Sequence, residues 1–190
     1  KRISDEYGIL FCTHAAETEA EQNDIKTRYN NSVIRHLDEH KLLGENVVLA
    51  HCVHLDDKEI SLLAKSKTNV VLNPMSNLKL GSGIAPVKEM KRAGINLTIG
   101  TDGAISGNDL DMWLAMRLTC GLAKGFNMED DALAAEQVLH MATINGAKAL
   151  GKSDSIGSLE IGKCADIIMV DVNNSHSIPL FDPITHLVFG

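Results

Sequence analysis

Four apolar runs, each ending in a polar residue, constrain the fold of this chain more than any other feature. They are GILFCTH, NVVLAH, TNVVLNP and INLTIGTD, at residues 8–14, 46–51, 68–74 and 95–102. Short apolar runs that alternate with helical patterns predict βαβ units with parallel strands. Because the runs are apolar on both faces, we expect helices to cover both sides of the sheet.

Helical patterns fill the intervals between and after these runs. Residues 31–43 carry apolar side chains at helical spacing, and residues 85–94 place Pro86 in a first turn and Gly94 at the end. Two further helical stretches, residues 109–125 and 133–151, follow the fourth run. The chain is therefore predicted to be an α/β protein with four parallel strands.

The sequence changes character near Gly151. The segment SIGSLEIGKCADIIMVDV, residues 155–172, alternates β-branched residues with glycines, and ITHLVFG closes the chain. Both segments predict strands, either of a small β-sandwich or of a hairpin packed on the helices. We therefore expect two domains, residues 1–150 and residues 151–190.

Composition excludes several classes of function. The 190 residues are 44% hydrophobic and 23% charged with a net charge of −7, so a folded core is expected and a nucleic-acid partner is not. No apolar run is long enough to cross a membrane, which favours a cytoplasmic protein. The four cysteines are too scattered for a disulfide framework or a zinc knuckle: Cys12, Cys52, Cys120 and Cys164.

The residues at the ends of the four runs suggest a metal site. His14, His51, Asn73 and Asp102 stand there, and the carboxyl ends of parallel strands meet at one face of the sheet. Imidazole nitrogens and carboxylate oxygens are ligands of Zn²⁺ and similar ions, and an ion would balance the charge of Asp102. Taken singly, each histidine is more often a structural residue and Asp102 more often a helix cap. Their recurrence at successive strand ends favours a shared site.

The remaining histidines carry no such signal. His54 is expected in a loop, three lie on helical segments, and two lie in the last part of the chain: His36, His40, His140, His176 and His186.

Five motifs extend the argument: THAAET (13–18), LAHCVHL (49–55), NPMSNLKLGSGIAP (73–86), GTDGA (100–104) and IGSLEIGKCADIIMVD (156–171). In these motifs and in their order, the chain resembles the metal-dependent amidohydrolase superfamily. Within it, the resemblance is to the S-adenosylhomocysteine and 5'-methylthioadenosine deaminases and the related chlorohydrolases. It implies the C-terminal half of a TIM-like (β/α)₈ barrel, strands five to eight, plus part of a small β-sandwich.

The resemblance also implies roles for particular residues. His14 and Asp102 are expected to bind the metal, and Asp102 also to accept a proton from the attacking water. Glu17 is expected to protonate a nitrogen of the substrate ring, although its sequence context alone favours a solvated acid at a helix start. His51 is expected to lie beside the metal-bound water or the attacked carbon.

Two more residues complete the expected site. Ser76 and Asn77 are expected to line the substrate pocket from the loop after the third run.

The cofactor implied is one divalent metal ion, Zn²⁺ ahead of iron. The family's HxH ligand pair is absent from this sequence, so the chain is expected to be a C-terminal fragment that is inactive alone and lacks its full metal site.

The implied reaction is hydrolytic deamination of an adenine-type nucleoside derivative: S-adenosylhomocysteine, methylthioadenosine or adenosine. A chlorohydrolase, a guanine-type deaminase and a non-catalytic relative are the alternatives within this fold. A flavodoxin-like binding module ranks last because no Gly-rich phosphate loop follows the first run. The expected partners are a small purine substrate and further copies of the chain, which would cover the sheet edges left bare by a half-barrel.

Overall fold

A single parallel sheet organises the protein, whose computed structural model describes residues 1–190. The strands are β1 (Phe11–Ala15), β2 (Val47–His51), β3 (Asn69–Leu72) and β4 (Leu97–Ile99), and they lie in the order in which the chain makes them. All three pairings are parallel, with His14 opposite Ala50 in the first of them. The four predicted strands and their parallel arrangement are therefore confirmed.

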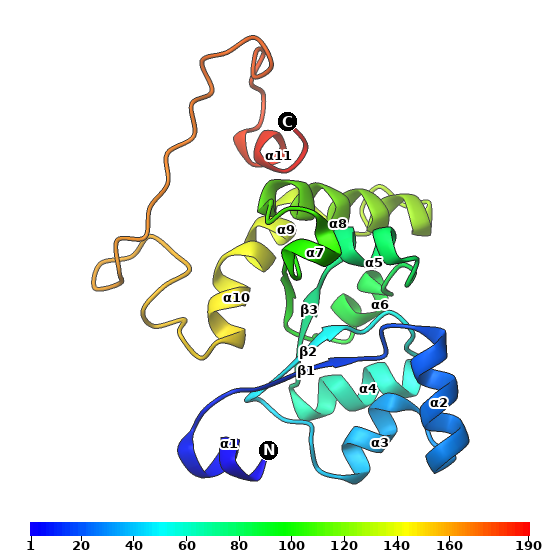
Figure 1. The fold of residues 1–190 in the computed structure, drawn as a ribbon. Coiled ribbons are helices and arrows are strands. Elements are labelled where there is room, and N and C mark those ends of the chain that lie inside the picture. Colours follow the sequence, from blue (N-terminus) through cyan, green and yellow to red (C-terminus); the bar gives the residue numbers. More distant parts are fainter.

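The helices pack against one face of this sheet, where alternate strand residues such as Leu49, Val70 and Leu97 enter the core, and Figure 1 shows them flanking the strands. Cys12 and His14 of β1 belong to the other face and are exposed, so the expected cover on both sides is wrong. The helices before β4 are α1 (Arg2–Tyr7), α2 (Glu19–Tyr29), α3 (Val33–Glu39), α4 (Asp57–Ser66), α5 (Pro74–Leu80) and α6 (Val87–Arg92). Those after β4 are α7 (Ala104–Gly107), α8 (Met112–Asn127), α9 (Ala135–Ala142), α10 (Ile144–Ala149) and α11 (Pro183–Phe189). None of the helices has both the length and the apolar character that crossing a membrane requires.

The helix boundaries follow local chemistry. At α4, the Asp56 side chain accepts hydrogen bonds from the amides of Lys58 and Glu59, and Glu59 accepts one in return from the Asp56 amide. This capping box satisfies amide groups that would otherwise lack partners. The stretch predicted as one helix over residues 133–151 is divided into α9 and α10, because Thr143 leaves the helical conformation.

The hydrophobic core lies between the sheet and its helices. It draws side chains from all four strands and from α3, α4, α6, α8, α9 and α11. Its largest fully enclosed members include Ile34, Leu49, Leu63, Met90 and Leu97. β1 and β4 each pair on one side only, so the sheet has two free edges.

The strands expected in the last forty residues are absent. Residues 152–182 form no helix or strand, and they loop away from the helices in Figure 1. Their apolar side chains are largely exposed, as at Ile161, Met169 and Phe181. A strand forms only where a neighbouring strand takes up its backbone hydrogen bonds, and none lies beside this segment. The strand prediction for residues 155–172 is therefore wrong for this chain.

The closing segment is a helix rather than the expected strand. Asp182 accepts hydrogen bonds from the amides of Ile184 and Thr185, and Pro183 occupies the first helical position. An Asp cap followed by Pro is a strong helix start, which outweighs the β-branched residues that follow. α11 packs against α8 and α9, and its Val188 is fully buried. The boundary at residues 150 and 151 stays a prediction.

We predict that the buried side chains of β2, one of the two inner strands, set much of the stability of the fold. Leu49 on β2 is fully buried, so Leu49→Ala is expected to lower the free energy of unfolding by about 2–5 kcal/mol. Urea unfolding measures this change. The matched control is Ile105→Ala at a side chain that is 89% exposed, where the change should stay within about 0.5 kcal/mol. Equal effects of the two substitutions would contradict the assigned core.

Candidate metal and catalytic site

Three predicted residues meet at the carboxyl edge of the sheet. His14 lies in β1, His51 ends β2 and Asp102 follows β4. One ligand atom from each lies within 4.8 Å of the other two. Residues separated by up to 88 positions in the chain thus come within reach of one small ion or molecule.

The backbone is strained at two of these strand ends. His51 has a φ of 76° and Asp102 a φ of 61°, both in the left-handed region that residues with a side chain rarely enter. Such a conformation costs on the order of 1 kcal/mol and persists only where surrounding contacts hold it. Here it turns both residues out of the regular strand pattern at the edge where the three side chains meet.

His51 is held in one orientation by α5. Its side chain is 1% exposed, and its Nδ1 lies 2.8 Å from Oδ1 of Asn77. With an amide oxygen as its partner, Nδ1 carries the hydrogen and Nε2 keeps a free lone pair. The ring also stacks on His14, with centroids 5.3 Å apart and planes inclined by 23°. His14 itself is exposed, so the pair has one buried and one accessible imidazole.

Asp102 is an ionised carboxylate with two donors. Oδ2 accepts a hydrogen bond of 2.6 Å from Oγ of Ser76, and Oδ1 accepts one of 2.7 Å from the amide of Gly103. Burial alone would raise the pKa of Asp102, but these hydrogen bonds outweigh it and lower the pKa below its usual value. The end of this apolar strand therefore holds a negative charge that can serve as a ligand.

Glu17 reaches the same place from the loop between β1 and α2. It stands one residue before Thr18, the N-cap of α2, so it is not part of the helix. Its Oε2 lies 3.8 Å from Nε2 of His51, and the side chain is 25% exposed. Sequence context alone favoured a solvated acid at this position. The structure instead directs the carboxyl group toward His51.

Ser76 and Asn77 were expected in a loop, and this placement is wrong. They lie in the first turn of α5, where both are buried. Pro74 opens that helix directly after Asn73, and proline is well suited to a first helical position. One helical turn thus carries both the hydroxyl that binds Asp102 and the amide that binds His51.

Two further residues, which the sequence did not single out, support Glu17. Oγ of Ser82 lies 3.4 Å from Oε1 of Glu17, a long hydrogen bond, and the Ser82 carbonyl lies 2.8 Å from Nε2 of His54. His54 lies in a loop, as the sequence predicts. The one indication in the sequence that Ser82 belongs to the site is its position inside the long motif NPMSNLKLGSGIAP.

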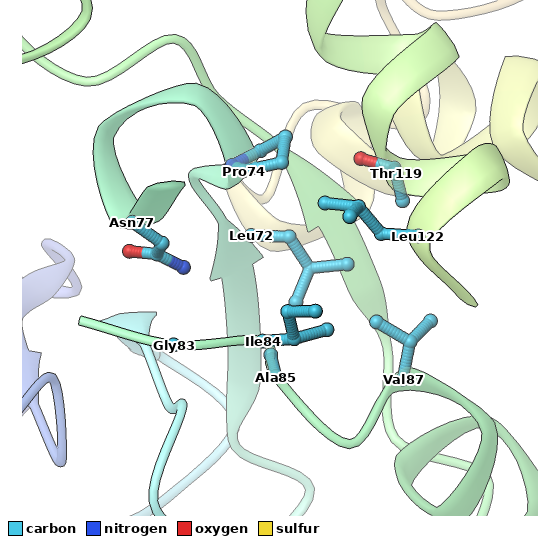
Figure 2. Close-up of a pocket in the computed structure, with 9 residues that line it drawn as sticks. All are labelled: Leu72, Pro74, Asn77, Gly83, Ile84, Ala85, Val87, Thr119 and Leu122. Carbon is cyan, nitrogen blue, oxygen red and sulfur yellow. The ribbon is translucent and has the colours of Figure 1, made fainter. Parts of the chain in front are cut away.

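A small apolar cavity lies between β3, α5, the loop that leads into α6, and α8 (Figure 2). Its volume is about 20 Å³, which is room for roughly one water molecule. It is lined by Leu72, Pro74, Asn77, Gly83, Ile84, Ala85, Val87, Thr119 and Leu122. A purine ring does not fit there, so this cavity is not a substrate pocket.

The donor set fits a zinc ion. Two imidazole nitrogens and a carboxylate oxygen are ligand types that Zn²⁺ accepts, and one ligand atom from each residue lies within 4.8 Å of the others. In a tetrahedral site with bonds of about 2.0–2.1 Å, two ligand atoms of one zinc ion lie roughly 3.4 Å apart. Ligand atoms as far apart as 4.8 Å exceed this spacing, so all three would bind one ion directly only after the ligand atoms approach one another by more than about 1 Å.

Comparison with known proteins agrees with this geometry. The sequence profile of the Amidohydrolase family matches residues 1–190. The chain belongs to the amidohydrolase family, in agreement with the motifs and with the α/β fold expected from them.

Three similar proteins narrow the relationship. The 5-methylthioadenosine/S-adenosylhomocysteine deaminase of Syntrophobacter fumaroxidans is 44% identical over 188 residues, which are 99% of this chain and 43% of that protein. An adenosine deaminase from Xanthomonas campestris with bound zinc superposes with a TM-score of 0.97 at 38% identity, covering 99% of this chain and 43% of its own. The atrazine chlorohydrolase of Arthrobacter aurescens, complexed with zinc, gives 0.93 at 27% identity, covering 98% and 41%. The chain thus spans less than half the length of these relatives.

We predict that Ser76 sets the acidity of Asp102. Because the pKa of Asp102 is lower in the folded chain than its ordinary value of about 3.9, ionised Asp102 stabilises the fold above about pH 4. That contribution is lost as the pH falls through the folded pKa. Ser76→Ala removes one donor, so the pKa of Asp102 should rise and stability at neutral pH should fall by on the order of 1 kcal/mol.

Carboxyl ¹³C NMR and urea unfolding at pH 7 and pH 3 measure these changes. Ser61→Ala is the control, because Ser61 is exposed on α4 and its hydroxyl donates only to the backbone carbonyl of Asp57. An unchanged pKa of Asp102 in Ser76→Ala would mean that the hydroxyl does not hold the carboxylate.

Proposed function

We propose that this chain supplies part of the active site of a zinc-dependent aminohydrolase that deaminates an adenine-type nucleoside derivative. Methylthioadenosine, S-adenosylhomocysteine and adenosine are the proposed substrates. The observation that carries the proposal is the meeting of His14, His51 and Asp102, with ligand atoms within 4.8 Å, beside the carboxyl group of Glu17. The printed functions of the two deaminases described above support the substrate class.

His14 and Asp102 are the proposed ligands of the metal ion. Both offer accessible donor atoms, and the pKa of Asp102 is lowered, so its carboxylate is ionised at neutral pH. When bound, a zinc ion supplies Lewis acidity that makes water a nucleophile near neutral pH. His51, fixed by Asn77 so that Nε2 keeps its lone pair, is placed to orient the water or the amine-bearing carbon.

The two carboxyl groups divide the proton transfers. Addition of water to the amine-bearing carbon sends one water proton to Asp102, while Glu17 gives a proton to the adjacent ring nitrogen. Collapse of the adduct breaks the carbon–nitrogen bond, and the departing amine takes the proton from Asp102 and leaves as ammonia. The proton of the new hydroxyl returns to Glu17 as the carbonyl forms, so both groups are restored. The Ser82 hydroxyl lies 3.4 Å from the Glu17 carboxyl and can donate to it while it is ionised.

A chlorohydrolase is the second candidate. The close superposition on the atrazine chlorohydrolase supports it, because the same strand-end residues can serve attack of water on a carbon that bears chloride. Asp102 accepts a proton in either reaction. The two reactions differ at the leaving group, because the amine takes a proton from Asp102 whereas chloride needs no proton in order to leave.

The free edges of β1 and β4 motivate a proposal about assembly. Each of these strands pairs on one side only, and open apolar edges tend to pair with further strands. We propose that other copies of the chain, or further segments of the same protein, cover them. Sedimentation of the chain as a stable, soluble monomer would count against this. The cytoplasmic location expected from composition stays a prediction.

We predict that catalysis requires more of the family fold than these residues. The chain alone, given Zn²⁺ and methylthioadenosine, should show no loss of adenine-type absorbance, because two firm ligands fall short of the three typical of a catalytic zinc site. A protein that joins this chain to the remaining length of the family fold should release ammonia. Turnover by the chain alone would contradict this.

In that longer protein, Glu17→Gln and Asp102→Asn should each lower kcat by about 10²–10⁴-fold. His140→Gln, at an exposed histidine on α9, is the matched control and should leave kcat unchanged. Release of chloride from a chlorotriazine without ammonia from any nucleoside would favour the chlorohydrolase. No turnover of either substrate class would favour a non-catalytic relative.

A further inference from the structure

A second pair of imidazoles lies outside the strand-end site. His36 is in α3 and His40 is the residue that caps its C-terminal end, one helical turn later. The amide of His40 still donates to the carbonyl of His36 at 3.3 Å, so the turn that joins them is intact. The ring centroids are 4.6 Å apart, with planes inclined by 78°. α3 packs against α2 and α4 and contributes nothing to the site formed by the strand ends.

The ring of His36 is fixed but incompletely satisfied. It stacks on Tyr29, the last residue of α2, with centroids 4.3 Å apart and planes inclined by 22°. Its Nδ1 is buried and has no hydrogen-bond partner. A buried polar atom without a partner costs free energy, and an unfilled ligand position is one of the few explanations for it in a folded protein.

We propose that His36 and His40 form a second metal site, which binds one exchangeable divalent transition-metal ion such as Ni²⁺, Cu²⁺ or Zn²⁺. Two histidines four residues apart on a helix present both imidazoles to the same ion, and neutral imidazole is a preferred ligand of these metals. The partly buried ring of His36 is preorganised by its stack on Tyr29. His40 is exposed, so its ring can turn until one nitrogen faces the ion.

The surroundings favour a cation over an anion. The pair stands in the last turn of α3, where the helix dipole is negative. Asp38 and Glu39, both exposed, lie between the two histidines in the sequence. Two protein ligands leave the other coordination positions to water, so the ion exchanges readily with solution. This site is independent of the proposed reaction.

The alternative is that Tyr29, His36 and His40 form only an aromatic packing cluster. Substitution by phenylalanine separates the two explanations, because it keeps the ring and the stack but removes the nitrogens. His36→Phe and His40→Phe should therefore fold with nearly unchanged stability, as measured by urea unfolding, and should lose the site. His36→Ala adds a variant that loses both the stack and the ligand.

The test is a metal titration of this chain by calorimetry, together with NMR of the imidazole nitrogens in Zn²⁺. The chain carrying His14→Ala is the background, so that the strand-end site does not contribute. The expected calorimetric result is one site that binds Cu²⁺ more tightly than either Ni²⁺ or Zn²⁺. The expected NMR result is a shift of the ring signals of His36 and His40 on addition of Zn²⁺. His36→Phe and His40→Phe should each weaken binding by at least about tenfold, since one chelating ligand is lost.

The matched control is His140→Phe, which removes a lone exposed histidine on α9 and should leave the affinity unchanged. The proposal is overturned if the ring signals of His36 and His40 stay fixed in millimolar Zn²⁺, or if His36→Phe binds Cu²⁺ as tightly as its parent. Neither result depends on whether the strand-end residues catalyse deamination.

Discussion

Parallel pairing of the four strands is the constraint on which the rest of the molecule depends. Because every strand runs in the same direction, every strand end lies at one edge of the sheet. That arrangement brings His14, His51 and Asp102 together although long stretches of helix separate them in the sequence. Side chains from all four strands pack in the core, which fixes the positions of the strand ends. A polar residue at a strand end can then join the site if its side chain has a suitable ligand or proton-transfer group.

The helix after β3 converts this gathering into a defined site. Ser76 and Asn77 are neighbours in the first turn of α5, yet they bind residues from two different strands, Asp102 and His51. Both side chains are buried, so their positions are set by packing rather than by solvent. Outer hydrogen bonds of this kind orient metal ligands and fix the form of a histidine ring. A change in how α5 packs on the sheet would therefore disturb two strand-end groups at once.

The parts of this structure that could be predicted are those that local pattern decides. Alternating apolar runs indicated the sheet, and the positions of His14, His51 and Asp102 at run ends followed from it. The tail was different, because residues 155–172 have strand-like composition but no neighbouring strand, and pairing is not a local property. The placement of Ser82 beside Glu17, and of His54 against the Ser82 carbonyl, depends on how two loops meet, which no spacing in the sequence records.

The left-handed backbone conformation at His51 and Asp102 restricts which amino acids can occupy these two positions. Among residues with side chains, asparagine, aspartate and histidine tolerate that conformation best, while β-branched residues are nearly excluded. Those three tolerated types are also oxygen and nitrogen ligands. The bend at these two strand ends thus narrows the choice of amino acid toward groups that can bind an ion or carry a proton, before any substrate is involved.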